Sequence, residues 1–525
     1  MPSTLQCPAA SLSAIQPVGL PARGRKDSYS QILSSTALIG GSSVASVLFS
    51  VIRTKAMALL LGPAGVGLMG VYGSIADVAQ SLSGMGIQSS GVRQIADAVG
   101  SEDKEQIART AVVLRRVAVA LGTGGAVTLA LLAGPISQVT FGGRQGAAGV
   151  ALLSLAVLFR EIAAGQGALI QGTRRIADLA RLTVLSALFG TVVTIPILYV
   201  WGTAGVVPSL VAVAAVSILT TSWYSRKVRL PDVTVTMAQM GRETRALLGL
   251  GSAFMVTAFL TVGAGYVIRV MVLRRVGFDA AGLYQAAWAL GGLYVTFILQ
   301  AMGADFYPRL TGVAKDHAAC NVLVNEQAHI SLLLAGPGVL ATLTLAPLVI
   351  ALFYSPKFYP AVTILRWVCL GMTLRVIAWP MGYIVVAQGA KAIMIATEVA
   401  AAVVHVGLAW ILLPIMGLDG AGVAFFGLYV WHGVLIYAIV RRRTGFRWSP
   451  ENLKLATLLL PATALTFSLF YLLPSWMAVA AGVALSALCG FHSAHILVTL
   501  LPDGSTVRLL RSWLVRLSLP VWRPR

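Results

Sequence analysis

The chain has 525 residues, of which 57% are hydrophobic and only 11% are charged, and its formal net charge is +21. A soluble domain carries about 25% charged residues, so most of this surface cannot face water and a soluble enzyme is excluded. The basic residues form short clusters between apolar runs, which argues against a nucleic-acid-binding surface and favours loops at a membrane.

Apolar runs long enough to cross a bilayer follow one another along the chain, because about 20 residues span its core as a helix. We expect an all-α polytopic membrane protein with about fourteen transmembrane helices, since the alternating pattern of a membrane barrel is missing. The predicted segments are 31–61, 65–90, 112–140, 146–171, 179–200, 203–223, 246–273, 281–306, 329–353, 361–388, 392–414, 418–440, 454–473 and 475–501.

The clusters of basic residues predict the orientation in the membrane. With the N-terminus inside, about 29 of the 39 Lys and Arg residues fall on the cytoplasmic side. The four in predicted outside loops are Arg144, Arg274, Arg275 and Lys357. Residues 1–30 lack the order of a signal peptide and are predicted to form a disordered cytoplasmic tail. Both termini are therefore expected in the cytoplasm.

The first and seventh segments carry the same pattern. Val51-Ile52-Arg53 precedes a turn that starts at Gly62, and Val267-Ile268-Arg269 precedes one that starts at Gly277. Six spans separate the copies, so they have the same orientation, as in transporters built from parallel repeats. Chance similarity is the alternative, since such turns are common in apolar chains. We predict two six-helix lobes (31–245 and 246–445), an extra transmembrane pair (446–501) and a basic cytoplasmic tail (502–525).

Charged residues within the spans are the candidate functional residues, since each costs about 2.5–3.5 kcal/mol when it faces lipid. Basic groups exceed acidic ones, which predicts a cationic cavity for an anionic ligand. The candidates are Arg53, Lys55, Arg269, Arg366 and Arg375. Arg53 and Lys55 lie about 200° apart around a helix, and Arg366 and Arg375 about 180°, so only one of each pair can face a given cavity. Snorkelling to the interface is the alternative for Arg53 and Lys55. For Arg160, we expect a structural pair with another helix.

Two polar stripes have helical spacing. Asp77, Ser81, Gly84 and Gln88 share one face of the second segment, which suits a cavity lining or a contact between helices. In the eleventh segment, Glu398 and His405 share a face and could carry protons, the alternative being a hydrogen-bonded cluster between helices. The four cysteines have no CxxC spacing, and His492 with His495 has no further ligands, so no metal site or cofactor is predicted.

Several stretches resemble Wzx-type O-antigen and lipid III translocases. They are LGPAGVG (61–67), GFDAAGLYQAAW (277–288), YPRLT (307–311) and LFYSPKFYP (352–360), followed by Trp367, Gly371, Gly382, Tyr383, Ala387 and Glu398. The resemblance covers roughly 30–440 and implies the multidrug/oligosaccharidyl-lipid/polysaccharide exporter fold. The departure is at the C-terminus, where the lipid III type ends after twelve spans.

The resemblance implies a flippase of the bacterial inner membrane, not an enzyme. It would move undecaprenyl-diphosphate-linked oligosaccharide from the cytoplasmic to the periplasmic leaflet by alternating access. Arg53 and Arg269 would bind the diphosphate, with Arg366 or Arg375 assisting, and Asp77 and Gln88 would contact the sugar. No nucleotide-binding motif is present, so a proton or sodium gradient is the candidate energy source. A polysaccharide polymerase and a chain-length regulator are the implied partners.

Two alternatives stay open. A cation-coupled multidrug exporter of the same superfold would need carboxylates rather than arginines to dominate its cavity. A membrane glycosyltransferase or polysaccharide polymerase would need a large outside loop, and the sequence has none of that length.

Overall fold

The computed structural model describes residues 22–500, which form helices without a strand in that range. The helices are α1 (Ala22–Ser83), α2 (Ile87–Gly100), α3 (Lys104–Leu131), α4 (Ala133–Phe141), α5 (Ala147–Gly172), α6 (Ile176–Trp201), η1 (Gly202–Gly205), α7 (Val206–Ser225), α8 (Met237–Val276), α9 (Phe278–Gly312), α10 (His317–Thr344), α11 (Ala346–Phe353), η2 (Pro356–Phe358), α12 (Ala361–Ala387), α13 (Lys391–Met416), α14 (Asp419–Thr444), α15 (Pro450–Leu472) and α16 (Ser475–Leu500).

Eleven stretches among the described residues are long and apolar enough to cross a membrane. Two of them contain a pair of helical segments, because α1 breaks at Gly62 and η1 separates α6 from α7. Together with the 35-residue helix α9, residues 22–500 contain fourteen long segments. The predicted all-α polytopic class is confirmed.

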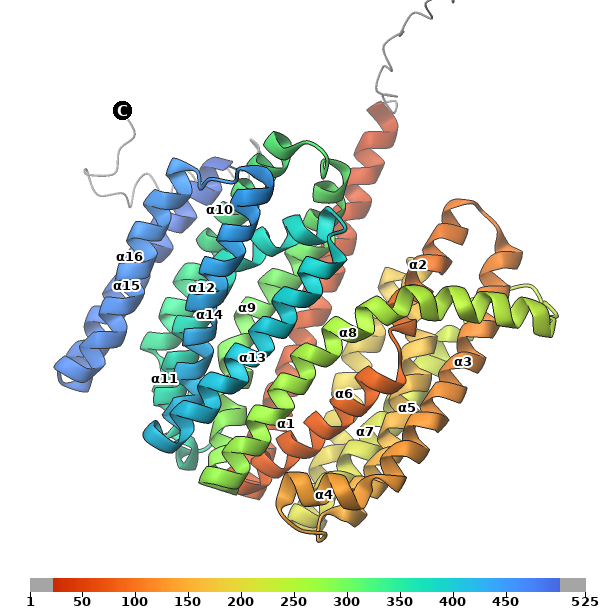
Figure 1. Cartoon of the computed structure of the whole chain (residues 1–525), viewed down its shortest axis with the longest axis horizontal. Coiled ribbons are helices and arrows are strands. Elements are labelled where there is room, and N and C mark those ends of the chain that lie inside the picture. The colour runs from red at the N-terminus through yellow and green to blue at the C-terminus, as the bar shows by residue number, and fades with distance from the viewer. Residues whose placement is uncertain (1–21, 501–525) are drawn as a thin grey trace, which may run out of the picture.

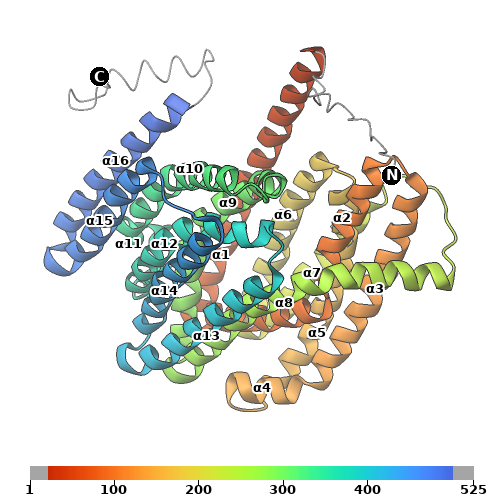
Figure 2. The ribbon, with the colours of Figure 1, turned by 45° about the horizontal axis from the view of Figure 1, so that its top comes forward.

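The long segments run between two ends of the bundle (Figure 1). We name these the α4 end, at the bottom of Figure 1, and the α2 end, at the top. Helices α2–α7 gather on one side and α9–α16 on the other, and α8 crosses diagonally between them. The turned view in Figure 2 shows the same division, with α15 and α16 on the outer flank of the second group.

Polar side chains cap helices α3, α8 and α10. The backbone N–H of Gln106 donates to Asp103 at 2.8 Å, and that of Ala319 donates to Asp316 at 3.0 Å. Thr236 and Gln239 form a reciprocal capping box at the start of α8. Such caps satisfy backbone donors that have no partner within the helix.

The turns that begin at Gly62 and Gly277 have related conformations. Gly62 has φ 63° and ψ −171°, and Gly277 has φ 114° and ψ 178°. Positive φ with extended ψ is almost restricted to glycine. These are the two turns of the proposed sequence repeat, 215 residues apart, so the likeness in sequence extends to backbone geometry.

The two groups of helices meet through glycine at the α4 end. We call residues 63–83 of α1 its second limb. A Cβ added to Gly67 of this limb would lie 2.5 Å from the carbonyl oxygen of Phe278 and 2.6 Å from the nitrogen of Gly282. A Cβ on Gly282 would in turn overlap the carbonyl group of Pro63. The second limb and α9 are thus in backbone contact.

Hydrogen bonds from asparagine attach the C-terminal helix pair to α10. The Asn325 amide nitrogen donates to the carbonyl of Arg447 at 3.0 Å, and its amide oxygen accepts from the N–H of Ser449 at 2.8 Å. Asn452 donates back to the carbonyl of Asn325 at 2.8 Å. Because these bonds hold the connection between α14 and α15, the pair α15–α16 is fixed to the rest of its group.

Several predicted segments are divided differently in the structure. The segment 65–90 ends at Ser83, because Met85 and Gly86 have φ of 44° and 67°, and Gln88 belongs to α2. The segment 112–140 is divided between α3 and α4, and 329–353 between α10 and α11. Helix α8 begins at Met237, within the range assigned to the first lobe.

We expect Gly67→Ala to destabilise the protein by about 1–3 kcal/mol, because the new methyl group must displace backbone atoms of α9. Gly73→Ala on the same limb is the matched control, since a Cβ there meets nothing within 4 Å. Thermal unfolding of the purified variants in detergent measures the difference. Equal melting temperatures would contradict the backbone contact.

Candidate functional site

A cavity of about 680 Å³ lies between the two groups of helices. Its wall combines the second limb of α1 with α2 and α5 from one group, α8, and Glu398 on α13 from the other. All four members of the predicted stripe line it, namely Asp77, Ser81, Gly84 and Gln88. Gln88 stays on the same wall although the helix breaks before it. We call this space the central cavity.

Ser81 offers an unused polar group to the central cavity. Its hydroxyl oxygen is buried and has no hydrogen-bond partner. A buried polar atom without a partner costs about 1–3 kcal/mol. A ligand hydroxyl group or a water molecule in the cavity would remove that penalty.

An ion pair joins the central cavity to a second cavity. Arg160 Nη2 on α5 lies 2.7 Å from Asp77 Oδ1 on the second limb. Both residues also line a space of about 390 Å³ among the second limb, α5, α6 and α7. We call this the Arg53 cavity, because Arg53 lines it as well. The expectation that Arg160 pairs with another helix is confirmed.

Arg53 is the unpaired cation of this second cavity. It takes part in none of the ion pairs found within the described residues. Gly190 makes room for it, since a Cβ there would lie 3.1 Å from Arg53 Nη1. A partly buried guanidinium without a carboxylate partner favours an anion nearby.

The other predicted cations lie elsewhere. Lys55 donates to the carbonyl oxygens of Ala351, at 2.5 Å, and Tyr354, beside the C-terminal end of α11. The Arg366 guanidinium lies 3.4 Å from the ring centroid of Phe470 on α15. The structure therefore does not bring Lys55 or Arg366 to the central cavity. Lys55 points away from the direction of Arg53, because residues two positions apart on a helix are separated by about 200°.

Arg269 and Arg375 have partners on helices of the second group. Arg269 Nε donates to Gln285 Oε1 at 3.0 Å, which joins α8 to α9. The Arg375 guanidinium lies 5.9 Å from the ring centroid of Tyr429, and its Nε is buried without a hydrogen-bond partner. Neither residue lines the central cavity or the Arg53 cavity.

The stripe on α13 is only partly at the central cavity. Glu398 lines it. His405 is 7% exposed and its ring packs on Phe425 at 5.8 Å between centroids. Seven helical residues separate the two by about 10 Å along the axis. The structure brings Glu398, but not His405, to the central cavity.

The charges of the central cavity differ from the predicted cationic surplus. Its wall contains three carboxylates, Asp77, Glu161 and Glu398, and one arginine, Arg160. Glu161 and Arg160 were not among the residues predicted for the site. Glu161 is 2% exposed and accepts a hydrogen bond of 3.4 Å from the hydroxyl of Ser83. The predicted cationic surplus is absent from this wall because Lys55, Arg269 and Arg366 have partners elsewhere.

One signal in the sequence could have identified Arg160. The 215-residue offset between Gly62 and Gly277 also relates Arg160 on α5 to Arg375 on α12. Each group of helices thus has an arginine at the same point of its fourth span. Arg160 has an acidic partner on the second limb, and the corresponding position of α9 is Gly292.

Comparison with known proteins identifies relatives along most of the chain. Residues 56–363 match a family described as polysaccharide biosynthesis protein. The chain is also similar to the lipid III flippase of Escherichia coli (strain K12), with 22% identity over 396 residues that cover 74% of this chain and 94% of the flippase.

Two solved structures show the same fold. One is an inward-facing multidrug resistance MATE family transporter of the MOP superfamily, with a TM-score of 0.62 and 16% identity over 76% of this chain and 94% of that one. The other is the lipid II flippase MurJ in an inward closed conformation, with a TM-score of 0.60 and 12% identity over 89% of this chain and 100% of that one.

Thiol labelling tests the position of the α13 stripe. In a variant whose four native cysteines are replaced by alanine, we expect a charged methanethiosulfonate to modify Glu398→Cys at least about tenfold faster than His405→Cys, since reaction requires access to the thiolate. Both positions lie on one helix, which makes each the control for the other. Similar rates at the two positions would contradict the described cavity wall.

Proposed function

This chain belongs to the polysaccharide biosynthesis protein family, and on that basis we propose that it flips a lipid-linked oligosaccharide across the membrane. The substrate class is an undecaprenyl-diphosphate-linked repeat unit, such as that of an O-antigen, exopolysaccharide or common antigen. The similarity to a protein named lipid III flippase supports this class. The observation that carries the proposal is the junction of a polar cavity with the unpaired Arg53 at the Arg160–Asp77 pair.

The central cavity would hold the sugar. Carboxylate and amide groups accept and donate hydrogen bonds to hydroxyl groups, and Asp77, Gln88 and Glu398 supply them on different walls. The free hydroxyl of Ser81 adds a further partner. These groups favour a neutral or amino sugar over a strongly anionic glycan, because carboxylates outnumber cations on the wall.

The diphosphate would bind where the two cavities meet. Arg160 borders both cavities and Arg53 lies in the second, so a diphosphate at the junction would have a guanidinium group on each side. Guanidinium groups bind phosphate oxygens in a bidentate manner. In this arrangement Arg160 takes the role that the sequence analysis gave to Arg269.

Alternating access would use the contact between the two groups of helices. The backbone contact of Gly67 with α9 supports a state that is closed at the α4 end. The opposite state requires this contact, and the bonds of Lys55 to Ala351 and Tyr354, to separate. An ion gradient would drive the cycle, with Glu398 as the carboxylate that binds a proton or sodium ion; His405, which packs on Phe425 away from the central cavity, is not part of this site.

We place the α2 end in the cytoplasm of a bacterium whose inner membrane holds the protein, with both termini on that side. Clusters such as Arg441, Arg442 and Arg443 at the end of α14 support this orientation. A polysaccharide polymerase and a chain-length regulator would act on the flipped lipid in the periplasm.

A second candidate function is the export of an organic cation. The three carboxylates of the central cavity favour it, and the fold is shared with a MATE family transporter. If lipid-linked oligosaccharide displaces a bound lipophilic cation, the result supports the flippase function. Transport of the cation without any effect of the lipid would favour the exporter.

In a strain without the gene, we expect Arg53→Ala to rescue flipping at least about tenfold less well than wild type, because hydrogen bonds to a charged group contribute about 1.5–3 kcal/mol. The accumulation of lipid-linked oligosaccharide in the cytoplasmic leaflet measures the loss, at equal membrane abundance. Arg366→Ala is the control, since Arg366 packs on Phe470 outside both cavities. Full rescue by Arg53→Ala would overturn the diphosphate site.

The orientation has its own test. In the cysteine-free variant, Arg229→Cys, in the connection between α7 and α8, should react with an impermeant reagent only from the cytoplasmic side. Arg144→Cys, in the connection between α4 and α5, should react only from the periplasmic side. The reverse pattern would contradict the proposed orientation.

A further inference from the structure

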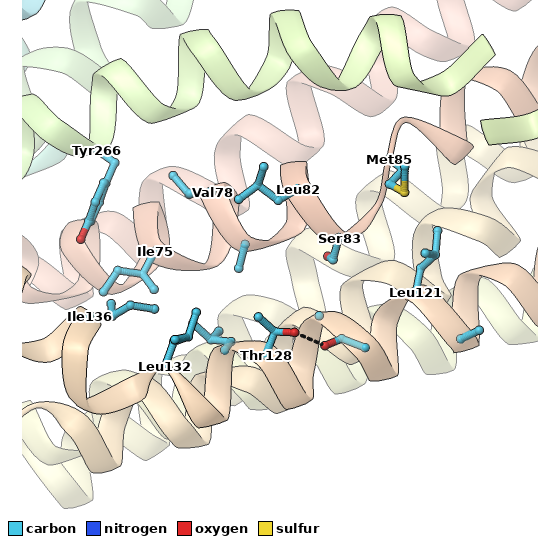
Figure 3. A pocket seen from close by; sticks show the side chains of 15 residues that line it. Ile75, Val78, Leu82, Ser83, Met85, Leu121, Thr128, Leu132, Ile136 and Tyr266 are labelled. Carbon is cyan, nitrogen blue, oxygen red and sulfur yellow. Dashed lines mark hydrogen bonds between the residues drawn. The ribbon is translucent and has the colours of Figure 1, made fainter. Parts of the chain in front are cut away.

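An apolar groove of about 450 Å³ runs between the second limb of α1, α3 and α8 (Figure 3). Figure 3 shows Ile75 and Ser83 of the second limb on the side toward α3, Val78 and Leu82 on the side toward α8, and Tyr266 of α8 at one end of the space. From Leu121 to Leu132, α3 and the residue that follows it border the groove for about 17 Å, since a helix rises 1.5 Å per residue. That length is about half the thickness of the hydrocarbon core.

The groove and the central cavity lie on opposite faces of one helix. Asp77 and Ser81 of the second limb face the cavity, whereas Val78 and Leu82 face the groove. Ile75 and Ala79, which also line the groove, lie about 160° from Asp77 on a helical wheel, because successive residues are 100° apart. Ser83, which lines the groove, donates to Glu161, which lines the cavity. The second limb therefore lies between the polar and the apolar space.

Helix α8 also borders both spaces. Val262 lines the central cavity, and Tyr266, one turn further along, lines the groove. On the side toward the α2 end, the backbones of Gly86 and Gly251 are in contact, because a Cβ on either would overlap the other segment. A passage between the second limb and α8 would thus lie on the α4 side of that contact.

Two features define the ends and width of the groove. At the α4 end, the hydroxyl groups of Tyr266 and Thr140 are hydrogen-bonded at 2.7 Å, which closes the groove with a satisfied polar pair. In its middle, Gly124 opens on empty space, since a Cβ there meets nothing within 4 Å. An isoprenoid chain has a methyl branch on every unit and needs more width than a straight acyl chain.

We propose that this groove binds the polyisoprenoid chain of the lipid substrate while its head group occupies the central cavity. The inference rests on the proposed function and adds the path of the lipid chain. The chain would pass between the second limb of α1 and α8. The chain stays in apolar surroundings while the diphosphate reaches Arg160. Its burial in the groove would contribute to affinity in proportion to the apolar area removed from contact with other lipids and water.

Binding to the purified full-length protein tests the groove with two ligands that share a head group. These are undecaprenyl-diphosphate-N-acetylglucosamine and its geranyl counterpart. In Gly124→Leu, where the new side chain fills the groove, we expect about tenfold weaker binding of the long-chain ligand, equivalent to about 1.4 kcal/mol. Binding of the geranyl ligand should not change. Gly407→Leu on α13 is the matched control, since a Cβ there also meets nothing within 4 Å.

The outcomes separate this inference from the proposed function. Equal binding of the long-chain ligand by wild type and Gly124→Leu would overturn the groove assignment only. Failure of the wild type to bind either ligand would overturn the proposed function itself.

Photolabelling of the wild type gives a second measurement that needs no variant. A diazirine on the undecaprenyl chain should label peptides from α3 and the second limb, and undecaprenyl diphosphate should displace the label. Labelling of the same peptides by a diazirine phosphatidylcholine that undecaprenyl diphosphate does not displace would assign the groove to bulk phospholipid and overturn the inference.

Discussion

Where the second limb of α1 crosses α9, backbone lies against backbone. A methyl group on Gly67 or Gly282 would not fit, so the two groups of helices approach more closely at the α4 end than side chains normally allow. Small residues permit this kind of contact in membranes, where packing rather than the hydrophobic effect holds helices together. The central cavity exists because the groups meet here and diverge beyond it. Ser81 of the second limb and Glu398 of α13 line this cavity from the two groups of helices.

The distribution of charge follows from the cost of ions at membrane depth. Arg160 is paired with Asp77, Lys55 with backbone carbonyls, and Arg366 with the face of an aromatic ring. In each of these arrangements a partner within the protein stabilises the positive charge, and no bound ligand is needed. Arg53 has no acidic partner among the described ion pairs, and this difference, rather than the number of cations, identifies the place for an anion. A surplus of positive charge in a membrane protein is therefore a weak guide to its binding site until the partners of each charge are known.

Helical periodicity was sufficient to predict what a single helix contributes. It placed Asp77 and Ser81 on one wall and the fourteen long segments along the chain, whereas Gln88 reaches the same wall from the next helix. It could not find partners that come from distant helices. The ring beneath Arg366 belongs to a residue 104 positions away, and the carbonyl groups bound by Lys55 are separated from it by 296 and 299 positions. The break at Met85 and Gly86 was also missed, because Ile87 continues the apolar pattern on the next helix.

The asparagine bonds between α10 and the start of α15 have a practical consequence. Because Asn325 holds both the carbonyl of Arg447 and the N–H of Ser449, the outer helix pair cannot tilt freely against its neighbours. A fluorophore or spin label on α16 therefore follows the whole second group of helices. Paired with a label on an outward-facing position of the first group of helices, it would measure the angle between the two halves of the transporter directly, without disturbing either cavity.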